Sequence, residues 1–522
     1  MNHPTLQPSA SSARRYEPAH GAARSITISA RSDNDHRRRR HRGGGDWATI
    51  RAVDILDSLV RRLPDGAVVT GGQTVQERAI DCWPLALLRQ VRGDGLPAPA
   101  AVVFPAATED VAAVLAWASE TGTAVIPRGG GSGVCGGAEA GAGSVVLDLS
   151  RMDKITDVDL VSRVVHVQAG VRGDLLEDAL AGHGLTVGHY PQSIAISTVG
   201  GWIAASSAGQ ASTGFGAIED VLLGLTAVLP DGQILRCRPV PRSAAGPDLR
   251  RLLVGSEGTL AVVTEAALAC RARPAGWEWL VCGFASFAAL TDGLREAVRA
   301  ETGAAVIRGY DETDAAFSFG GLGHPGGCVG MLGFPAGLVA LEDRRRLAAG
   351  IMHRAGASGE LGSRYGEHWW EHRNDTVGTF LQIMGPERTF GAGVVVDTIE
   401  VAGLWSAVPA LYAGVRAALA QHAEVVGCHL SHLYSSGSSL YFTFLIRGTD
   451  DHDVQARYLA AWDQAVRSCA ANGGTITHHH GIGRLKAAFL PMELGESGVG
   501  VLTRIKGALD PRGIMNPGVL LP

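Results

Sequence analysis

Three consecutive histidines, His478, His479 and His480, are the residues of this sequence best suited to chemistry. They precede Gly481-Ile482-Gly483, an odd composition for the interior of a core strand. Imidazoles change protonation near neutral pH, so such a group can move protons beside a bound molecule. In extended geometry, His478 and His480 would share one face and His479 would point the other way. The alternatives are a metal site, which needs further ligands because adjacent histidines chelate poorly, and a purely structural triplet.

A glycine-rich loop, Pro127 to Gly133, follows an apolar run that reads as a strand. Its glycines let the backbone turn tightly and let consecutive N–H groups converge on an anion such as a diphosphate. Residues 131–136 also satisfy GxGxxG, but the sequence after them leads into a strand, whereas a nicotinamide-binding unit would continue as a helix. No GK[ST] follows either, which excludes a P-loop. A turn without a ligand would compete if the loop stood alone.

Two further segments of small residues follow, at 189–209 and 255–268. Each lies near a predicted strand, and three such segments suit one extended ligand spread along a groove. In this order the three segments resemble the FAD-binding domain of the vanillyl-alcohol-oxidase superfamily, also called the PCMH-type domain. The resemblance covers about residues 95–275 and implies an FAD cofactor. Many members tether FAD through a histidine of the loop; because Ser132 and Gly133 stand there, we expect non-covalent FAD.

The resemblance assigns the FAD contacts to four short stretches: the glycine-rich loop for the diphosphate, a second stretch for the flavin and ribityl region, and two that complete the site. These residues are Pro127, Arg128, Gly129, Gly130, Gly131, Ser132, Gly133, Gln192, Ser193, Ile194, Ala195, Ile196, Ser197, Thr198, Ala205, Ser206, Ser207, Ala208, Glu257, Gly258, Thr259, Leu260, Ala261, Val262 and Val263.

Residues 440–444 alternate like a strand and carry Tyr441. Taken alone, a tyrosine in such a strand is more often a packing residue. Together with the segments above and GGTITHHHGIGRLK (473–486), this stretch is similar to the alkylglycerone-phosphate synthases over nearly the whole globular chain. In that family an acyl-dihydroxyacetone phosphate is held as a flavin adduct, the fatty acid leaves, and a long-chain alcohol replaces it. The resemblance makes Tyr441 the proton donor and acceptor, His478 to His480 groups for proton transfer and substrate binding, and Arg308 an activity-critical arginine.

Two positions depart from that family. Leu404 stands where a second substrate-binding arginine is expected, and Gln192 replaces an aspartate. Guanidinium groups suit phosphates, so the loss of one weakens phosphate recognition. The substrate therefore remains open at this point.

The main alternative is an FAD-linked oxidoreductase that acts on a 2-hydroxy acid or another small alcohol. Members of that group often carry an HxGDGNLH metal motif and a GEHGIG ending. Here only His432 of the first motif remains, and His479 replaces the glutamate of the second, so we expect no metal. Arg308 and Arg373 could anchor a carboxylate in such an enzyme. A flavin-binding protein without catalysis is a third reading, disfavoured by the tyrosine and histidines.

The pattern of elements predicts an α+β protein with a two-part FAD-binding domain and an α+β cap. A strand at 101–105, a helix at 108–122 and a strand at 123–127 lead into the glycine-rich loop. We expect a disordered arginine-rich tail at 1–45, the FAD domain at 46–277 and a cap or substrate domain at 278–475. Residues 476–522 would return to the FAD domain.

The charge and hydropathy of the chain limit the classes of molecule that it is expected to bind. A net charge of −5 gives no case for nucleic acid, and the basic run at 36–42 reads as part of a solvated tail. No apolar core of a signal peptide is visible, and the uncharged stretch 193–218 is too weakly apolar for a membrane helix. We therefore expect a cytoplasmic protein with a small-molecule or lipid-like substrate and at most peripheral membrane contact. The assembly that we consider for this protein is a homodimer.

Overall fold

The glycine-rich loop leaves the edge strand of a small mixed sheet. In this computed structural model, which describes residues 55–96 and 98–521, the strand order is β1-β2-β4-β3. β3 and β2 run parallel to β4, with helix α4 between β2 and β3 in the chain. The apolar residues of β2 and β4 are fully buried, as expected for strands covered on both faces. The bounds are β1 Val68–Val69, β2 Ala101–Val103, α4 Thr108–Thr121, β3 Val125–Arg128 and β4 Val145–Asp148.

A five-stranded antiparallel sheet of order β5-β6-β10-β8-β9 forms the second part of the FAD-binding region. Two helices, α5 and α6, cover it, and their apolar residues share one core with β6, β8 and β10. The bounds are β5 Ile155–Asp159, β6 Val164–Gln168, α5 Gly173–Ala181, α6 Val199–Ala205, β8 Leu222–Val228, β9 Ile234–Cys237 and β10 Val262–Ala269.

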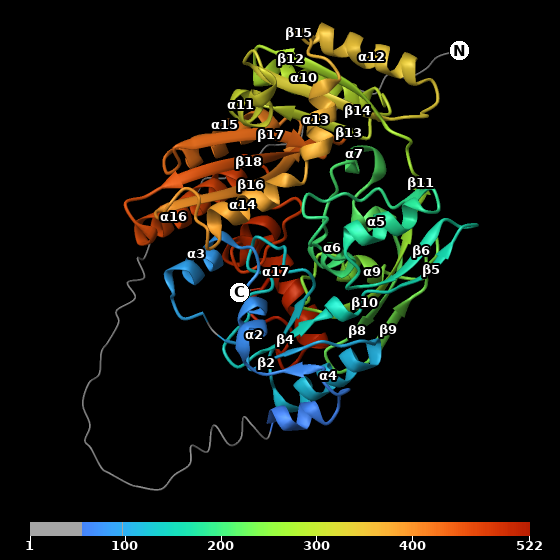
Figure 1. The fold of residues 1–522 in the computed structure, drawn as a ribbon, viewed down its shortest axis with the longest axis vertical. Helices are drawn as coiled ribbons and strands as arrows, with labels where there is room; N and C mark the ends of the chain where they lie inside the picture. The colour runs from blue at the N-terminus through green and yellow to red at the C-terminus, as the bar shows by residue number, and fades with distance from the viewer. Residues whose placement is uncertain (1–54, 97, 522) are drawn as a thin grey trace, which may run out of the picture. The chain divides into compact units, whose positions relative to one another are not determined.

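A seven-stranded antiparallel sheet, order β15-β12-β14-β13-β17-β18-β16, follows in the chain (Figure 1). Strands β16 and β18 pair over eleven residues each, and α15 and α16 pack beside them. The bounds are β12 Trp277–Phe284, α10 Phe287–Arg299, β13 Val306–Tyr310, β14 Cys328–Pro335, α12 Leu341–Arg354, β15 Ala357–Glu360, β16 Val394–Leu404, α15 Val408–Ala420, β17 Val425–Ser431, β18 Gly437–Arg447 and α16 Asp451–Ala471.

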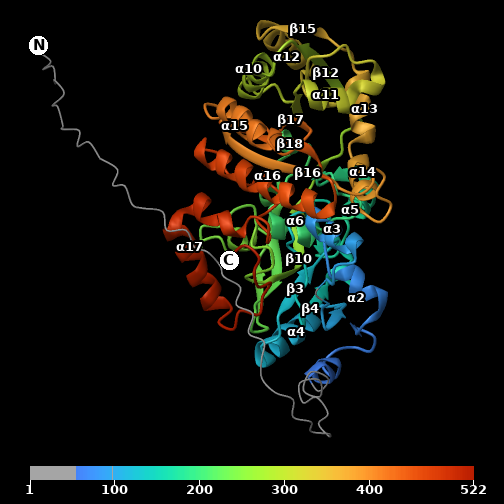
Figure 2. The same ribbon diagram turned by 90° about the vertical axis from the view of Figure 1, so that its left-hand side faces the viewer.

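The last helix and the residues after it return to the FAD-binding sheets. Figure 2 shows α17 (Leu490–Leu509) beside β10, and the Lys506 ammonium donates to the Thr259 carbonyl at 2.7 Å. Beyond the helix, the Val125 N–H of β3 donates to Ile514 at 2.8 Å, and the Asn516 N–H donates back to Val125 at 2.9 Å. The C-terminal segment thus extends the sheet that carries the glycine-rich loop.

Shorter elements connect these sheets. They are α2 Gly72–Arg78, α3 Pro84–Arg92, η1 Leu149–Arg151, β7 Leu185–Thr186, α7 Ser212–Phe215, α8 Ile218–Val221, α9 Leu249–Leu253, β11 Arg271–Ala272, α11 Glu312–Phe319, η2 Gly320–Leu322, α13 Arg364–His372, α14 Asp375–Met384 and η3 Ala487–Phe489.

Helices and sheets of this kind confirm the predicted α+β class. The arginine-rich segment 1–45 lies outside the described residues. The chain passes from the five-stranded to the seven-stranded sheet between β11 and β12, close to the boundary expected at 277. Among the described residues, no helix is long and apolar enough to cross a membrane.

Candidate active site

The glycine-rich loop packs directly against the second predicted cofactor segment. A Cβ atom on Gly129 would lie 2.3 Å from the Thr198 Oγ1, and one on Gly130 would lie 1.7 Å from the Ile196 carbonyl oxygen. Both distances are far inside van der Waals contact, so only glycine permits this approach. The two loops therefore lie together, as a shared ligand requires.

The other two segments adjoin the same place. The Gly255 N–H donates to Ile203 at 3.0 Å and the Glu257 N–H to Ala204 at 2.9 Å, which joins segment 255–263 to the end of α6. A Cβ on Gly258 would lie 2.9 Å from the Pro127 ring. The four predicted cofactor segments are thus brought into one region.

Several side chains predicted to contact the cofactor are buried or bind other residues of the protein. Arg128 is buried, donates to the Ile80 carbonyl at 2.6 Å and lies 3.9 Å from Asp148. Ser197 accepts from the Trp202 indole at 2.8 Å. The side chains of Thr198, Ile194 and Thr259 to Val263 are buried as well, which leaves Gln192, Ser193, Ala195 and Ile196 as the partly or fully accessible members of their stretch.

The histidine triplet is held in a turn by a buried carboxylate. Glu400 Oε1 accepts four hydrogen bonds, from the Thr477 hydroxyl at 2.6 Å and from the N–H groups of His478, His479 and His480 at 3.1, 3.2 and 2.8 Å. Successive N–H groups of an extended strand alternate in direction, so three of them cannot meet one oxygen. The extended triplet expected above is therefore wrong, because Glu400 curls the backbone into an anion-binding nest.

A second buried carboxylate, from the FAD-binding region, holds the end of the same turn. Glu257 accepts from the Ile482 N–H at 2.7 Å and the Gly483 N–H at 2.8 Å. Burial raises its pKa to about 7, against the effect of these two hydrogen bonds. Glu257 therefore joins a predicted cofactor segment to the turn of the triplet, and its carboxylate faces this turn.

Tyr441 lies among imidazoles. Its ring stacks on His429 at 4.7 Å between centroids and 18°, and lies 6.0 Å from His479 and 5.5 Å from His480. Burial raises the pKa of the Tyr441 phenol well above its usual range. At neutral pH the hydroxyl is therefore protonated, as a proton donor must be.

Arg308 joins this cluster through His429. Its Nη2 donates to His429 Nε2 at 2.6 Å, its Nε donates to the Tyr310 hydroxyl at 2.9 Å, and its guanidinium lies 5.0 Å from the Trp369 ring. A guanidinium only donates, so His429 Nε2 accepts and Nδ1–H donates to Asp314 at 2.7 Å. This arrangement fixes a neutral His429 ring beneath Tyr441, in agreement with a pKa that burial and Arg308 lower.

A third group of imidazoles borders the site. The ligand nitrogens of His432, His478 and His479 lie within 4.8 Å of one another, close enough to hold a metal ion. Ser212 is hydrogen-bonded to His432 Nδ1 at 2.6 Å, which leaves Nε2 of that ring toward the cluster. Burial and the neighbouring histidines lower the pKa of His432 and His479 well below the usual value. The prediction of no metal stays a prediction.

A cavity of about 320 Å³ connects the triplet to the third cofactor segment. His478, Thr477 and Tyr434 line one side, and Ser206 and Ala208 line another. The Tyr434 hydroxyl is hydrogen-bonded to His478 Nε2 at 2.8 Å. The triplet therefore faces the region expected to hold the flavin.

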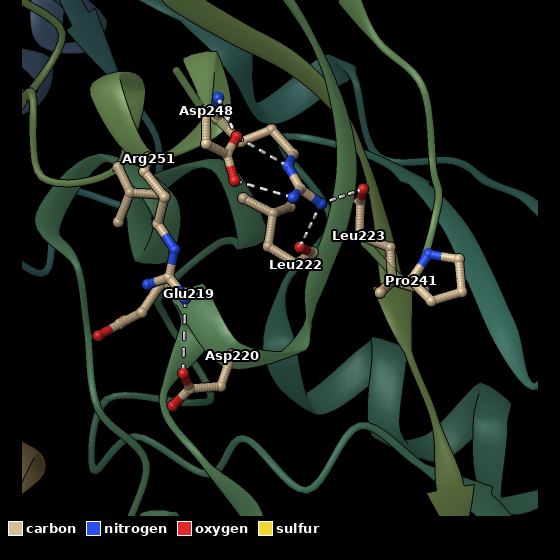
Figure 3. A pocket seen from close by; sticks show the side chains of 9 residues that line it. Glu219, Asp220, Leu222, Leu223, Pro241, Asp248 and Arg251 are labelled. Atoms are coloured by element: carbon tan, nitrogen blue, oxygen red, sulfur yellow. Dashed lines mark hydrogen bonds and ion pairs between the residues drawn. The ribbon is translucent and has the colours of Figure 1, made fainter. Parts of the chain in front are cut away.

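A smaller cavity, of about 130 Å³, is lined by residues of α8 and α9 (Figure 3). Its two arginines already have acidic partners: Arg250 bonds Asp248 at 2.8 Å, and Arg251 lies 3.7 Å from Asp220. Because these cations are neutralised locally, the cavity offers no ready site for an anionic substrate.

Leu404 and Arg373 have different surroundings. Leu404 ends β16 opposite Gly437 and its side chain is 62% exposed, so no buried anion contact is made there. Arg373, at the end of α13, lies over the Trp370 ring at 3.7 Å, and its Nε is buried with no hydrogen-bond partner among the described residues. The Arg373 guanidinium has no acidic partner among the described residues, so its charge is open to a ligand.

Four residues of the site were missed from the sequence: Glu400, Lys486, whose Nζ donates to Glu400 Oε2 at 2.9 Å, His429 and Asp314. Glu400 had a usable signal, since an acid in the middle of the apolar run VVVDTIEV costs free energy unless it is paired. His429 and Asp314 are joined only by the pairing of β13 with β17 and by α11, so their spacing along the chain carries no signal.

Comparison with known proteins shows the family of this chain. Residues 99–238 match the family described as FAD binding domain, and residues 274–520 match FAD linked oxidases, C-terminal domain. The alkyldihydroxyacetonephosphate synthase of Trypanosoma brucei brucei is 30% identical over 456 residues, which cover 81% of this chain and 73% of that protein. The chain belongs to the alkyldihydroxyacetonephosphate synthase family. The synthase of the same name from Dictyostelium discoideum is 28% identical over 469 residues, which cover 84% of this chain and 75% of that protein.

The chain is also similar in sequence to FAD-linked oxidoreductases. The uncharacterised FAD-linked oxidoreductase YgcU of Escherichia coli is 32% identical over 501 residues, 90% of this chain and 98% of that protein. A solved alkyldihydroxyacetonephosphate synthase shares the fold with a TM-score of 0.73 at 24% identity, covering 89% of this chain and 84% of that one. p-Cresol methylhydroxylase shares it with a TM-score of 0.73 at 15% identity, over 91% and 97% of the chains.

This member of the alkyldihydroxyacetonephosphate synthase family is an FAD-dependent enzyme, and its FAD is non-covalent. The residues present fit that cofactor. Glycines at 129 and 130 let the loop pack against Thr198 and Ile196, where a Cβ would clash, and Ser132 and Gly133 provide no imidazole for a tether.

Proposed function

We propose that this enzyme exchanges the acyl group of an acyl-dihydroxyacetone phosphate for a long-chain alcohol, a step of ether-lipid synthesis. The observation that carries the proposal is the position of Tyr441, stacked on His429 and beside His479 and His480. The likeness to synthases from three organisms supports it.

The exchange needs a group that moves protons. The bond between the substrate carbon and the acyl oxygen breaks, and the fatty acid leaves as a carboxylate with that electron pair. The alcohol oxygen then forms a new bond to the same carbon and gives up its proton. A neutral tyrosine with imidazoles around it can accept and return protons in these steps. Bound FAD supplies the reactive isoalloxazine ring.

Arg308 is the residue we assign to the anionic part of the substrate. Two of its N–H groups bind Tyr310 and His429, and a guanidinium has five such donors, so others remain for a phosphate. Because Leu404 offers no charge, recognition at its end of β16 must rely on shape and apolar contact. Arg373 is the second guanidinium that a phosphate could reach.

The test is an anaerobic reaction of the purified holoenzyme with an acyl-dihydroxyacetone phosphate and a labelled long-chain alcohol. We expect equal amounts of free fatty acid and labelled ether, without net reduction of the flavin. Absence of an ether product, with FAD bound, would reject the proposal.

A second candidate is an FAD-linked oxidoreductase acting on a small 2-hydroxy acid. Arg373 favours it, because a guanidinium half-buried on Trp370 without a carboxylate partner suits a substrate carboxylate. The likeness to YgcU, to glycolate oxidase subunit GlcD of Bacillus subtilis and to a probable D-lactate dehydrogenase of Danio rerio supports it as well. In this case a panel of D-2-hydroxy acids would bleach the flavin, and air would restore its colour.

A further inference from the structure

The C-terminal segment after α17 is fixed by two residues at the end of that helix. Asp510 is buried and accepts hydrogen bonds from the Ile514 N–H at 3.0 Å and the Met515 N–H at 2.8 Å. Lys506 Nζ is hydrogen-bonded to Asp510 and donates to the carbonyls of Met515 and Thr259, each at 2.7 Å. All three N–H groups of this ammonium are therefore used. The C-terminal segment is thereby held against the last predicted cofactor segment, which contains Thr259.

Asn516 reaches from this segment to the loops of the cofactor region. It is buried, and its side-chain Nδ2 donates to the Gly137 carbonyl and to the Glu257 carbonyl, each at 2.8 Å. Its backbone N–H donates to the Val125 carbonyl of β3 at 2.9 Å. These partners belong to the strand that leads into the glycine-rich loop, to the chain just after that loop, and to the last predicted cofactor segment. One residue therefore joins three parts of the cofactor region.

Asn516 also has a backbone conformation that few residues tolerate. Its φ is 43°, in the left-handed region, where asparagine and aspartate are the usual residues besides glycine. Aspartate has nearly the same shape, but its carboxylate only accepts hydrogen bonds, and glycine keeps the backbone conformation without a side chain. Substitution by either residue therefore removes the two amide bonds without straining the backbone.

We infer that Asn516, held in place by Lys506 and Asp510, is a positioning residue for FAD. It keeps the chain around the glycine-rich loop and the segment beginning at Glu257 in the one arrangement that binds the cofactor. A ligand is bound less tightly as the fraction of protein in the competent arrangement falls, so loosening these loops weakens the retention of FAD. Retention needs no substrate, and the proposed exchange reaction is therefore not involved.

An asparagine that only fastened the C-terminal segment would behave differently. Its loss would lower the free energy of unfolding, but the protein that remains folded would release FAD at the original rate. A positioning residue acts within the folded state, so that its loss lets FAD leave while the helices and sheets persist. The rate of FAD release from folded protein therefore distinguishes the two roles.

The experiment dilutes the purified holoenzyme into FAD-free buffer and follows FAD release by the rise in flavin fluorescence. The far-ultraviolet circular dichroism of the same sample reports whether the protein stays folded. In Asn516→Asp we expect release to be about tenfold faster or more, because two hydrogen bonds are replaced by a carboxylate facing two carbonyl oxygens. Asn516→Gly loses the bonds without that repulsion, so its release should lie between Asn516→Asp and the unsubstituted protein. The circular dichroism should be unchanged in both variants.

Asn472→Asp is the matched control. Asn472 also donates through Nδ2 to a backbone carbonyl, that of Ser468 at 2.8 Å, but at the end of α16 and apart from the predicted cofactor segments. It should release FAD at the original rate. If neither Asn516 variant folds, Lys506→Met decides, since it removes two bonds to backbone carbonyls and keeps the Asn516 amide; release about threefold faster or more is expected. Release at the original rate in the folded variants, or release only together with loss of the circular dichroism, overturns the assignment.

Discussion

At the scale of single residues, the site depends on how burial changes the protonation of a few side chains. Tyr441 is held protonated by burial, and His429 beneath it is held neutral by Arg308 on one side and Asp314 on the other. A neutral phenol can donate a proton, and a neutral imidazole can accept one at its unprotonated nitrogen, so both a donor and acceptors are available in the cluster. This balance is what an exchange of one leaving group for one nucleophile requires.

Tyr441→Phe is expected to keep FAD and the fold but to lower turnover by ~10²–10⁴-fold, because only the hydroxyl that moves the proton is lost. Turnover is compared with the flavin absorbance of the purified variant. Tyr412→Phe is the control, since that hydroxyl bonds Asp311 at 3.1 Å, outside the cluster around Tyr441. Near-full turnover in Tyr441→Phe would end the assignment.

At the scale of elements, the cofactor region is made by loops that approach closer than side chains allow. The loop after β3 meets the loop before α6, and the C-terminal strand segment 514–516 supports β3 from its other edge. Asn516 further ties this region together by donating to the carbonyls of Gly137 and Glu257 at 2.8 Å. The predicted cofactor region is therefore built by three parts of the chain that are far apart in sequence.

Gly130→Ala is expected to reduce FAD retention about tenfold or more, because the added Cβ would overlap the Ile196 carbonyl and force the two loops apart. The measurement is the FAD-to-protein ratio after gel filtration, together with the dissociation constant. Gly141→Ala is the control, since a Cβ there meets nothing within 4 Å. Equal FAD retention in the two variants would show that the approach of these loops does not hold the cofactor.

At the scale of the whole molecule, burial shifts the pKa of titratable groups both in the FAD-binding region and around the seven-stranded sheet. Burial raises the pKa of Asp81 to about 6 and those of Glu257 and Asp397 to about 7. It lowers the pKa of His189 to about 3 and that of His478 to about 4, and those of His432 and His479 well below normal. Acidification therefore acts on two opposing sets of groups.

The sign of the pH dependence follows from counting protons between pH 5 and 6. Six histidines, the four above together with His429 and His480, bind a proton more readily when unfolded because burial lowers their pKa, which makes stability fall as the pH falls. The three carboxyls bind a proton more readily when folded, which acts the other way. Because the histidines outnumber these carboxyls, stability is expected to fall between pH 6 and 5, and each unopposed proton contributes about 1.4 kcal/mol per pH unit. Chemical denaturation of the holoenzyme at several pH values measures it.

Asp397→Asn provides the control for this prediction. It removes one of the three opposing carboxyls, so the loss of stability on acidification should become steeper by about 1.4 kcal/mol per pH unit. A protein that grows more stable between pH 6 and 5 would contradict the assignment of the histidines as neutral in the folded state.

The sequence by itself determined the fold class and, through the resemblance of its motifs, the cofactor and the family. Glycines at fixed positions after a strand, a histidine triplet and a tyrosine in an alternating strand are local patterns, and local backbone geometry decides what they can do. The strand, helix and strand around α4 follow from the same local rules. The α+β class was therefore within reach of the sequence, and the FAD cofactor and the synthase family were implied by the resemblance of these motifs to known families.

Only the tertiary structure decided how the triplet is shaped and what surrounds Tyr441. The turn at 478–480 exists because Glu400, some eighty residues earlier, collects its N–H groups, and Glu257 from the FAD-binding region collects the next two. Burial sets the protonation of these groups, and burial is a property of packed sheets and helices. No spacing along the chain encodes it, since each carboxylate meets its partners only after β16, β18 and the C-terminal segment come together.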